Sequence, residues 1–153
     1  MIDNNLSVNA IYLKKGWKDT GYPKDLLGAN VMVLSRLSST FSGLSQNSII
    51  EGSVKSETST SVVNSKILGP CVFGENTKIE NSIVGPYVSL GNNVVIKDTS
   101  IEDSIISDDC FIQSNQKVAK SMIGKSSHIV VNDHKEVSYI VGDHSMVGKT
   151  FSL

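Results

Sequence analysis

Short segments of five or six residues repeat along most of this chain, and nearly every one opens with an apolar residue. From residue 50 onward the opening residues are Ile50, Ser56, Val62, Ile67, Phe73, Ile79, Val84, Leu90, Ile96, Ile101, Ile106, Ile112, Val118, Ile123 and Ile129. Only Ser56 departs from the apolar rule. Such a short, sustained period is typical of a solenoid, in which each unit buries its apolar side against its neighbours.

A second position, four residues after the first, tests the same register. It carries mostly small residues, which are Val54, Thr60, Cys71, Thr77, Val88, Val94, Cys110 and Ser127, with Gln116 as the misfit. Five-residue segments at 62–66, 79–83 and 96–100 give the first two coils a 17-residue period. Gly, Asn, Asp and Pro separate the segments, and these residues favour the tight corners that a narrow solenoid needs.

These patterns predict a mainly β fold: a left-handed parallel β-helix (a hexapeptide-repeat solenoid), preceded by a short strand and one α-helix. A two-sheet sandwich is the alternative, but it would need alternating strands joined by hairpin turns. The expected division is a block at 1–43, holding the strand, the helix and a linker, and a β-helix at 44–153 with a C-terminal capping strand.

The ends of the chain follow other patterns. The short strand is expected over Leu6–Lys14, and a helix of about 15 residues over 22–37, because Pro23 suits a first helical position. The residues expected on one face of this helix are Leu26, Leu27, Asn30, Val33 or Leu34, and Leu37. Residues 38–43 read as a linker, residues 130–138 as a loop, and Tyr139–Val147 as one last strand.

Composition excludes several classes of protein. The 153 residues include 14 basic and 15 acidic ones without a long run of either sign, which argues against a nucleic-acid surface. No apolar stretch approaches the roughly 18 residues of a membrane span, and the first residues do not resemble a signal peptide. Two cysteines are too few for a disulfide framework. We therefore expect a cytoplasmic protein that binds neither nucleic acid nor membrane.

Two groups of motifs carry a family resemblance. The segment G-W-K-D-T-G at 16–21 is followed by P-K-D-L-L at 23–27 and by Ala29-Asn30. The solenoid contains I-E-N-S-I-V-G-P-Y at 79–87 and V-G-D-H-S at 141–145. Together they resemble the C-terminal portion of sugar-phosphate nucleotidyltransferases, and most of all the long-form glucose-1-phosphate thymidylyltransferases. The resemblance covers the chain from about residue 8 to its end.

The resemblance implies a function in sugar-nucleotide biosynthesis. Members transfer a nucleotidyl group to a sugar 1-phosphate, with Mg²⁺ held by two aspartates, and Asp19 carries one of these positions. The partner aspartate and the family's Gly-rich nucleotide-binding loop are absent from this sequence. The resemblance therefore assigns no catalytic residue here, and it implies Mg²⁺ only where a catalytic domain completes the site.

Two roles are compatible with this resemblance. The chain can be a part whose nucleotidyltransferase domain comes from a separate chain, or a β-helix that serves oligomerisation or regulation as a homo-oligomer. In either case the chain alone is expected to be inactive. The block at 2–37 would normally pack against the missing sheet, with Trp17 in that core, so alone it should be partly exposed or self-associating, while the solenoid should fold without it.

An acyltransferase that uses acyl-CoA is the alternative function, because such enzymes also use a β-helix and need a histidine as general base. The three histidines, His128, His134 and His144, show no partner motif and are expected to be surface residues. Their spacing matches no standard zinc site. Cys71 and Cys110 both occupy small inward positions, so we expect them to pack in the core.

Overall fold

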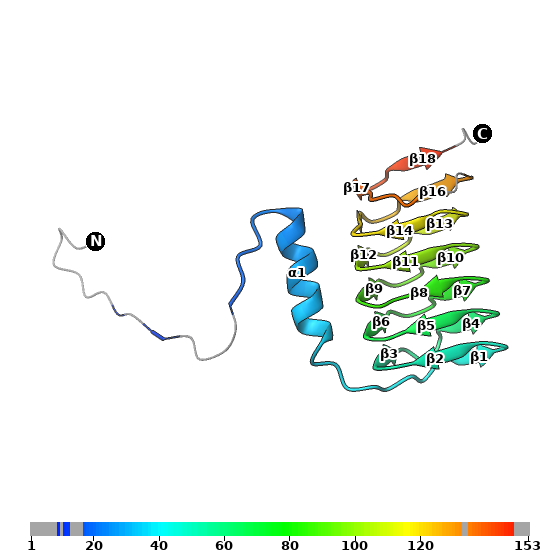
Figure 1. The fold of residues 1–153 in the computed structure, drawn as a ribbon, viewed down its shortest axis with the longest axis horizontal. Coiled ribbons are helices and arrows are strands. Elements are labelled where there is room, and N and C mark those ends of the chain that lie inside the picture. Colours follow the sequence, from blue (N-terminus) through cyan, green and yellow to red (C-terminus); the bar gives the residue numbers. More distant parts are fainter. Residues whose placement is uncertain (1–8, 10, 13–16, 133–134, 149–153) are drawn as a thin grey trace.

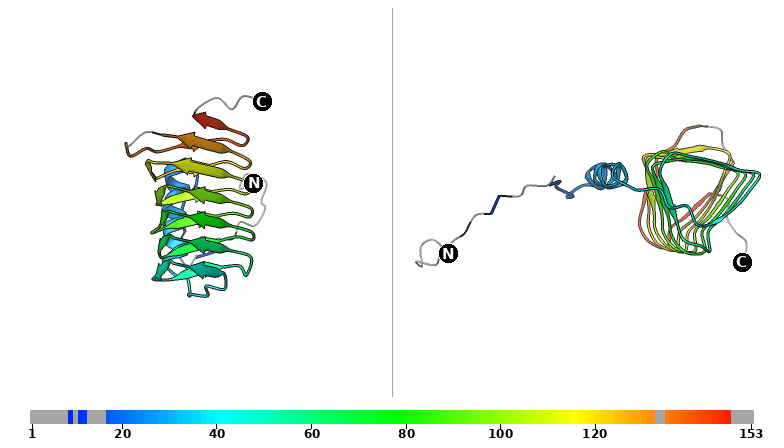
Figure 2. Two further views of the ribbon diagram at one scale, coloured as in Figure 1. Left: turned by 90° about the vertical axis from the view of Figure 1, so that its right-hand side faces the viewer. Right: turned by 90° about the horizontal axis from the view of Figure 1, so that it is seen from below.

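The computed structural model describes residues 9, 11–12, 17–132 and 135–148. In this part of the chain one helix, α1 (Pro23–Leu34), precedes a stack of short strands. Figure 1 shows the strands stacked in successive coils, and the view from below in Figure 2 shows that each coil is triangular. Each side of the triangle belongs to a different parallel sheet.

All three sheets are built from strands of two to four residues. The seven-stranded sheet contains β1 (Leu44–Gln46), β4 (Ser61–Val63), β7 (Lys78–Glu80), β10 (Val95–Lys97), β13 (Phe111–Ser114), β16 (His128–Val131) and β18 (Met146–Gly148). The six-stranded sheet contains β3 (Val54–Ser56), β6 (Cys71–Phe73), β9 (Val88–Leu90), β12 (Ser104–Ile106), β15 (Met122–Ile123) and β17 (Ile140–Val141). The five-stranded sheet contains β2 (Ile49–Glu51), β5 (Lys66–Leu68), β8 (Ile83–Val84), β11 (Ser100–Glu102) and β14 (Lys117–Ala119).

The predicted parallel solenoid is confirmed, and it begins at Leu44, one coil side before the first predicted segment. Of the fifteen predicted opening residues, all except Ile50 are buried, and Ile50 is partly buried against the same core. All the predicted small positions are buried as well. Each coil therefore adds only a few aliphatic side chains, worth about 1.5–3 kcal/mol each, to a core shared with its neighbours.

The two residues that break the inward pattern are held by hydrogen bonds. The Ser56 hydroxyl accepts hydrogen bonds from the backbone N–H groups of Ser42 and Gly43, at 3.1 and 3.2 Å. The side-chain oxygen of Gln116 accepts a hydrogen bond of 3.0 Å from the Tyr139 hydroxyl. A buried polar group costs little when it is paired in this way. At both positions where the predicted pattern of apolar or small inward residues fails, a neighbouring segment supplies a hydrogen-bond partner.

The corners between strands adopt left-handed backbone conformations. Twelve described residues other than glycine have a positive φ, and most of them are Asn or Asp. These side chains tolerate the left-handed region better than other side chains that carry a Cβ. The Asn and Asp corners predicted from the sequence are thus a consequence of backbone geometry.

One column of corner side chains is linked by hydrogen bonds from coil to coil. Asn47 donates from Nδ2 to Asn64, Asn64 to Asn81, and Asn81 to Oδ1 of Asp98, at 3.4, 3.4 and 3.1 Å. From the other direction, Gln113 donates to Oδ2 of Asp98 at 2.9 Å. Each Asn partner in this column is 17 residues from the next, which confirms the period predicted for the first coils.

A second column follows another corner and also ends in a carboxylate. Asn76 donates to Asn93 at 3.1 Å, and Asn93 donates to Asp109 at 2.9 Å. The ammonium group of Lys125 lies 3.5 Å from the other oxygen of Asp109. The hydrogen bond from Asn93 is the main cause that holds the pKa of Asp109 below its ordinary value, and Lys125 adds to the effect.

A carboxyl titration followed by NMR should therefore give Asp109 a pKa below that of an unperturbed aspartate. Because the pKa is lower in the folded state than in the unfolded chain, the contribution to stability is present above the unfolded pKa and is lost as the pH falls through the folded one. Asn93→Ala should raise the pKa of Asp109 towards the ordinary value, whereas Asn76→Ala, one step away, should change it less. An Asp109 pKa that does not respond to Asn93→Ala would contradict this account.

Helix α1 runs along the six-stranded sheet, outside the triangle (Figures 1 and 2). Pro23 is at its start and needs no N–H partner there. The helix rises about 5.4 Å per turn and the coils about 4.8 Å, so successive turns meet successive coils. The buried residues are Leu27 and Leu34, which are 8% and 2% exposed, with Asn30 partly buried between them.

The predicted face of this helix holds for Leu27, Asn30 and Leu34, but it also included residues that lie on the exposed side. Leu26 and Val33, which were assigned to the same face as Leu27 and Leu34, are 38% and 62% exposed. The helix also ends at Leu34 rather than near Leu37. Apolar residues stand on both sides of α1, and only contact with the sheet decides which side is buried.

The predicted linker at 38–43 also contacts the solenoid. Thr40 forms a parallel bridge with Lys55, and Phe41 packs against the core at the end of the stack. These contacts cover the first coil. The linker therefore acts as a cap for that end, as solenoid ends require.

The C-terminal end differs from the prediction in one respect. The segment 139–147 does not form one capping strand, because a corner at His144 with a φ of +57° divides it into β17 and β18. These two strands extend two different sheets, so the solenoid continues to Gly148. The predicted loop begins after Val131, since β16 includes Val130 and Val131. Most of the predicted strand at 6–14 lies outside the described residues, and the three residues of it that are described, Asn9, Ile11 and Tyr12, belong to no strand.

Candidate functional site

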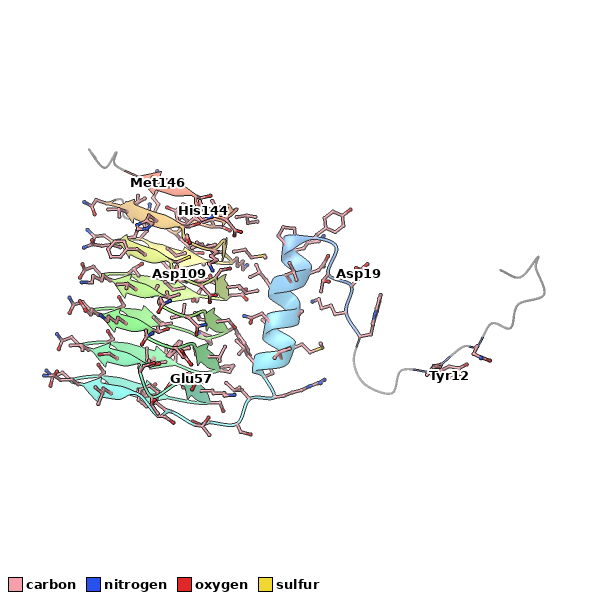
Figure 3. The ribbon with its side chains drawn as sticks, turned by 180° about the vertical axis from the view of Figure 1, so that it is seen from behind. Tyr12, Asp19, Glu57, Asp109, His144 and Met146 are labelled. Atoms are coloured by element: carbon pink, nitrogen blue, oxygen red, sulfur yellow. The ribbon has the colours of Figure 1, made fainter. Side chains whose placement is uncertain are left out.

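Asp19 lies in the exposed segment that precedes α1, on the side of the helix away from the solenoid (Figure 3). Its Oδ1 accepts a hydrogen bond of 3.2 Å from the backbone N–H of Gly21. This bond closes a short turn that leads the chain into the helix. The carboxylate itself remains open to solvent.

The residues around Asp19 do not fit a magnesium site. A divalent cation of this kind needs several oxygen ligands, usually including more than one carboxylate when a nucleotide is bound. Among the described residues, no three His, Cys, Asp or Glu side chains are grouped closely enough to hold a metal ion. The role assigned to Asp19 by resemblance thus stays a prediction, and nothing in the described chain completes it.

Neither cysteine is a candidate nucleophile. Cys71 and Cys110 are both buried, as predicted, and both are free thiols. Burial raises the pKa of the Cys71 thiol to about 12 and raises that of Cys110 as well. Because the thiolate is the reactive form, both groups are inert at neutral pH.

The two described histidines, His128 and His144, do not form a catalytic group either. His128 is exposed on the outer face of the seven-stranded sheet, where its ring stacks on Phe111 with 6.0 Å between centroids. His144 is exposed at the last corner. His134 lies outside the described residues. The expectation of surface histidines is thus confirmed for His128 and His144.

One cavity lies between α1 and the solenoid and has a volume of about 330 Å³. Its walls are apolar at Leu27, Val31 and Ile140, and Lys24 and Lys120 also line it. Asp103 also lines it, and Oδ1 of this residue is buried without a hydrogen-bond partner in the described structure. No sequence pattern predicts this cavity, because its lining residues come from α1 and from three further places in the sequence, at residues 103, 120 and 140.

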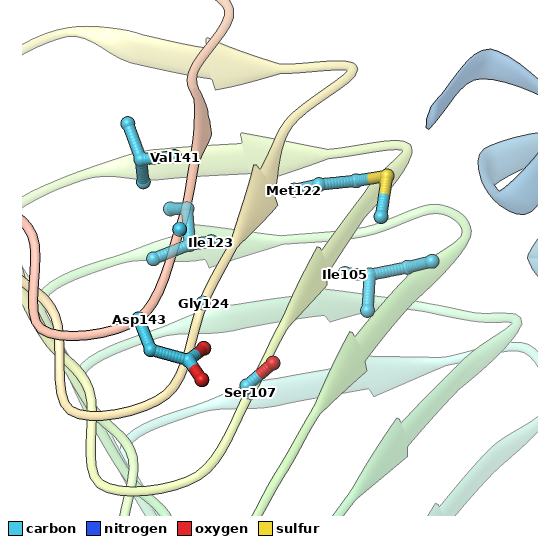
Figure 4. Close-up of a pocket in the computed structure, with 8 residues that line it drawn as sticks. Ile105, Ser107, Met122, Ile123, Gly124, Val141 and Asp143 are labelled. Atoms are coloured by element: carbon cyan, nitrogen blue, oxygen red, sulfur yellow. The ribbon is translucent and has the colours of Figure 1, made fainter. Parts of the chain in front are cut away.

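A second cavity, lined by residues of β12, β15 and β17 and of the corners that follow these strands, is shown in Figure 4. It measures about 170 Å³ and is lined by Ile105, Ser107, Met122, Ile123, Gly124, Val141, Gly142 and Asp143. Ligand sites usually exceed about 300 Å³, so this hollow is too small for a sugar nucleotide. Neither cavity is lined by a histidine.

The outward side of α1 and the segment before it carry exposed apolar side chains. Trp17, Tyr22 and Val33 are 73%, 68% and 62% exposed, and Leu26 lies beside them on the helix. Large apolar side chains gathered on one side of an element usually mark an interaction surface. This exposure agrees with the expectation that the block at 2–37 packs against another domain.

No helix within the described ranges is long and apolar enough to cross a membrane. The fold thus defines a parallel β-solenoid with one helix docked on a sheet and a candidate metal ligand held outside it. In the described residues it does not assemble the groups that a catalytic site requires.

Comparisons with known proteins agree with the resemblance drawn from the sequence. The chain is 34% identical over 150 residues to the glucose-1-phosphate thymidylyltransferase of Streptomyces griseus, a match that covers 95% of this chain and 42% of the relative. It is 30% identical over 150 residues to the enzyme of the same name from Streptomyces antibioticus, with 96% and 42% covered. The low-salt glycan biosynthesis nucleotidyltransferase Agl11 of Haloferax volcanii is 26% identical over 132 residues, with 84% and 37% covered.

No protein-family model matches the sequence. The chain spans about two fifths of the length of the curated relatives that it matches. It is therefore related to sugar-1-phosphate nucleotidyltransferases, and the related part forms a β-solenoid.

Proposed function

We propose that this chain is the C-terminal β-helix part of a sugar-1-phosphate nucleotidyltransferase, similar to glucose-1-phosphate thymidylyltransferase. It carries the solenoid and a docked helix, and a catalytic domain outside this chain supplies the nucleotide-binding loop. The observation that carries the proposal is similarity along 95% of the chain to only 42% of a thymidylyltransferase. The exposed apolar side of α1 supports it, because that side is where another domain would pack.

The position of Asp19 outside the solenoid is compatible with the metal-binding role that the family resemblance implies for it. Asp19 stands in the segment that precedes α1, two residues after the exposed Trp17, and thus at the edge of the surface offered to the second domain. A second carboxylate from that domain would make the pair that Mg²⁺ needs. The chain alone lacks nucleotidyl transfer, and a cytoplasmic location and assembly into homo-oligomers remain part of this proposal.

The test uses the isolated chain and a chimera. The isolated chain, supplied with dTTP or UTP, glucose 1-phosphate and Mg²⁺, should release no pyrophosphate. The chimera replaces the matching segment of the Streptomyces griseus enzyme with this chain and should transfer nucleotide. In the chimera, Asp19→Asn should lower the rate by at least about 100-fold if Asp19 is a metal ligand.

Asp25→Asn in the first turn of α1 is the matched control, and it should leave the rate of the chimera within a few-fold. Turnover by the isolated chain would refute the claim that it is inactive. An Asp19→Asn chimera as active as its parent would refute the role of Asp19 alone.

A further inference from the structure

Asn30 is the polar residue on the buried side of α1, and both ends of its amide are used. Its Nδ2 donates a hydrogen bond of 3.1 Å to the backbone carbonyl of Tyr87. Its Oδ1 accepts a hydrogen bond of 2.6 Å from the hydroxyl of Ser89 in β9. Leu27 and Leu34 lie on either side of it against the same sheet. Apolar contacts alone would let the helix slide or rotate, whereas two directional bonds fix its position.

The backbone of Tyr87, which accepts the hydrogen bond from Asn30, is itself hydrogen-bonded to the coils before and after it. The Tyr87 N–H donates to the carbonyl of Pro70 at 2.9 Å, and the Tyr87 carbonyl also accepts from the N–H of Ser104 at 3.2 Å. These bonds tie the corner at Tyr87 to the coils before and after it. Asn30 is thus bound to the middle of the stack rather than to a free loop.

Close to Asn30 in sequence, α1 also contacts the segment that carries Asp19. The side chain of Lys18 crosses the helix at Gly28, where a Cβ atom would overlap with its ammonium group. The absence of a side chain at Gly28 therefore leaves room for the end of the Lys18 side chain. Contacts lead in this way from residues 17–21 to α1, and from α1 through Asn30 to the solenoid.

We propose that Asn30 is a positioning residue through which the solenoid fixes α1 and the 17–21 segment. If Asp19 is a metal ligand, the same contacts also fix the position of its carboxylate. This consequence rests on the proposed function, because Asp19 can bind a metal only together with the second domain. The two hydrogen bonds of Asn30, to Tyr87 and from Ser89, are called the latch below. The latch does not depend on the proposed function, since both bonds lie within this chain. The solenoid thus sets where the surface offered to the catalytic domain stands.

The test compares amide hydrogen exchange in the whole chain with and without Asn30→Ala. Removing the amide leaves the Ser89 hydroxyl and the Tyr87 carbonyl without this partner, so exchange in α1 should accelerate by about ten-fold or more. Amides of β7 and β10, which do not touch the helix, should exchange as before. Trp17, the single tryptophan of the sequence, should also lose fluorescence anisotropy.

Variants of the partners separate a latch from a general loss of stability. Ser89→Ala should accelerate exchange in α1 by a smaller factor, and combining it with Asn30→Ala should add little, because the two share one hydrogen bond. Asn30→Asp keeps the acceptor for Ser89 but turns a carboxylate oxygen toward the Tyr87 carbonyl, so it should also accelerate exchange in α1. Val33→Ala on the exposed side is the control and should leave exchange in α1 within about two-fold.

Equal acceleration in α1 and in the solenoid, or no change in α1, would overturn the positioning role. Failure of the proposed function would appear in the chimera assay instead, and it would leave the exchange pattern unchanged. The two proposals can therefore fail separately.

Discussion

Replacing Gly85 with alanine is expected to destabilise the protein by about 3 kcal/mol or more, and to lower its melting temperature by roughly 10 °C. Gly85 has a φ of +108°, a conformation that residues with a Cβ rarely adopt. A Cβ atom here would overlap with the backbone carbonyl oxygen of Leu68 and would lie 2.8 Å from Sγ of Cys71. The Leu68 carbonyl belongs to the backbone of the neighbouring coil and the Cys71 side chain is buried, so neither can move aside cheaply.

Gly142→Ala is the matched control for this substitution. Gly142 also stands between strands of the solenoid, but a Cβ atom there meets nothing within 4 Å. Thermal unfolding followed by circular dichroism should place the Gly142→Ala variant close to the parent. Similar melting temperatures for the Gly85→Ala and Gly142→Ala variants would show that the left-handed corner at Gly85 is not needed for the fold.

The second large effect is expected in the core. Ile101 in β11 is fully buried, and Ile83 in the adjacent strand β8 points outward and is 47% exposed. Ile101→Ala should cost about 2–5 kcal/mol, because it removes buried methyl groups and leaves a cavity in a narrow core. Ile83→Ala should change the free energy of unfolding by only about 0.5 kcal/mol.

Urea denaturation of both variants measures this difference directly. It also tests the register, since a shift by one residue would turn Ile101 outward and Ile83 inward. Equal losses of stability, or a larger loss for Ile83→Ala, would contradict the strand pairing of the five-stranded sheet.

The solenoid could be predicted from the sequence because its contacts repeat. Each inward residue meets the equivalent residue of the next coil, so a local pattern carries the same information as the long-range pairing. Ser56 and Gln116 looked like errors in the pattern because their hydrogen-bond partners lie in segments that do not repeat. The pattern could show that these positions are unusual, but not why they are tolerated.

The docking of α1 could not be predicted in the same way. Leu26 and Val33 are as apolar as Leu27 and Leu34, so the sequence alone cannot decide which pair is buried. Asn30 was placed on the buried side, yet its partners on the solenoid are more than fifty residues away. The candidate site at Asp19 came from a family resemblance, and the described structure brings no second ligand to it.

The two columns of corner side chains have a consequence for how such a chain can lengthen. In each column the asparagines donate in one direction, and the column ends at an aspartate that receives donors from both sides. A coil duplicated among the asparagines, for example between Asn64 and Asn81, would keep every donor facing an acceptor. A coil inserted directly after Asp98 or Asp109 would separate the carboxylate from the donor that it now receives from Gln113 or Lys125. The aspartates thus mark where a duplicated coil would interrupt the column of side-chain contacts.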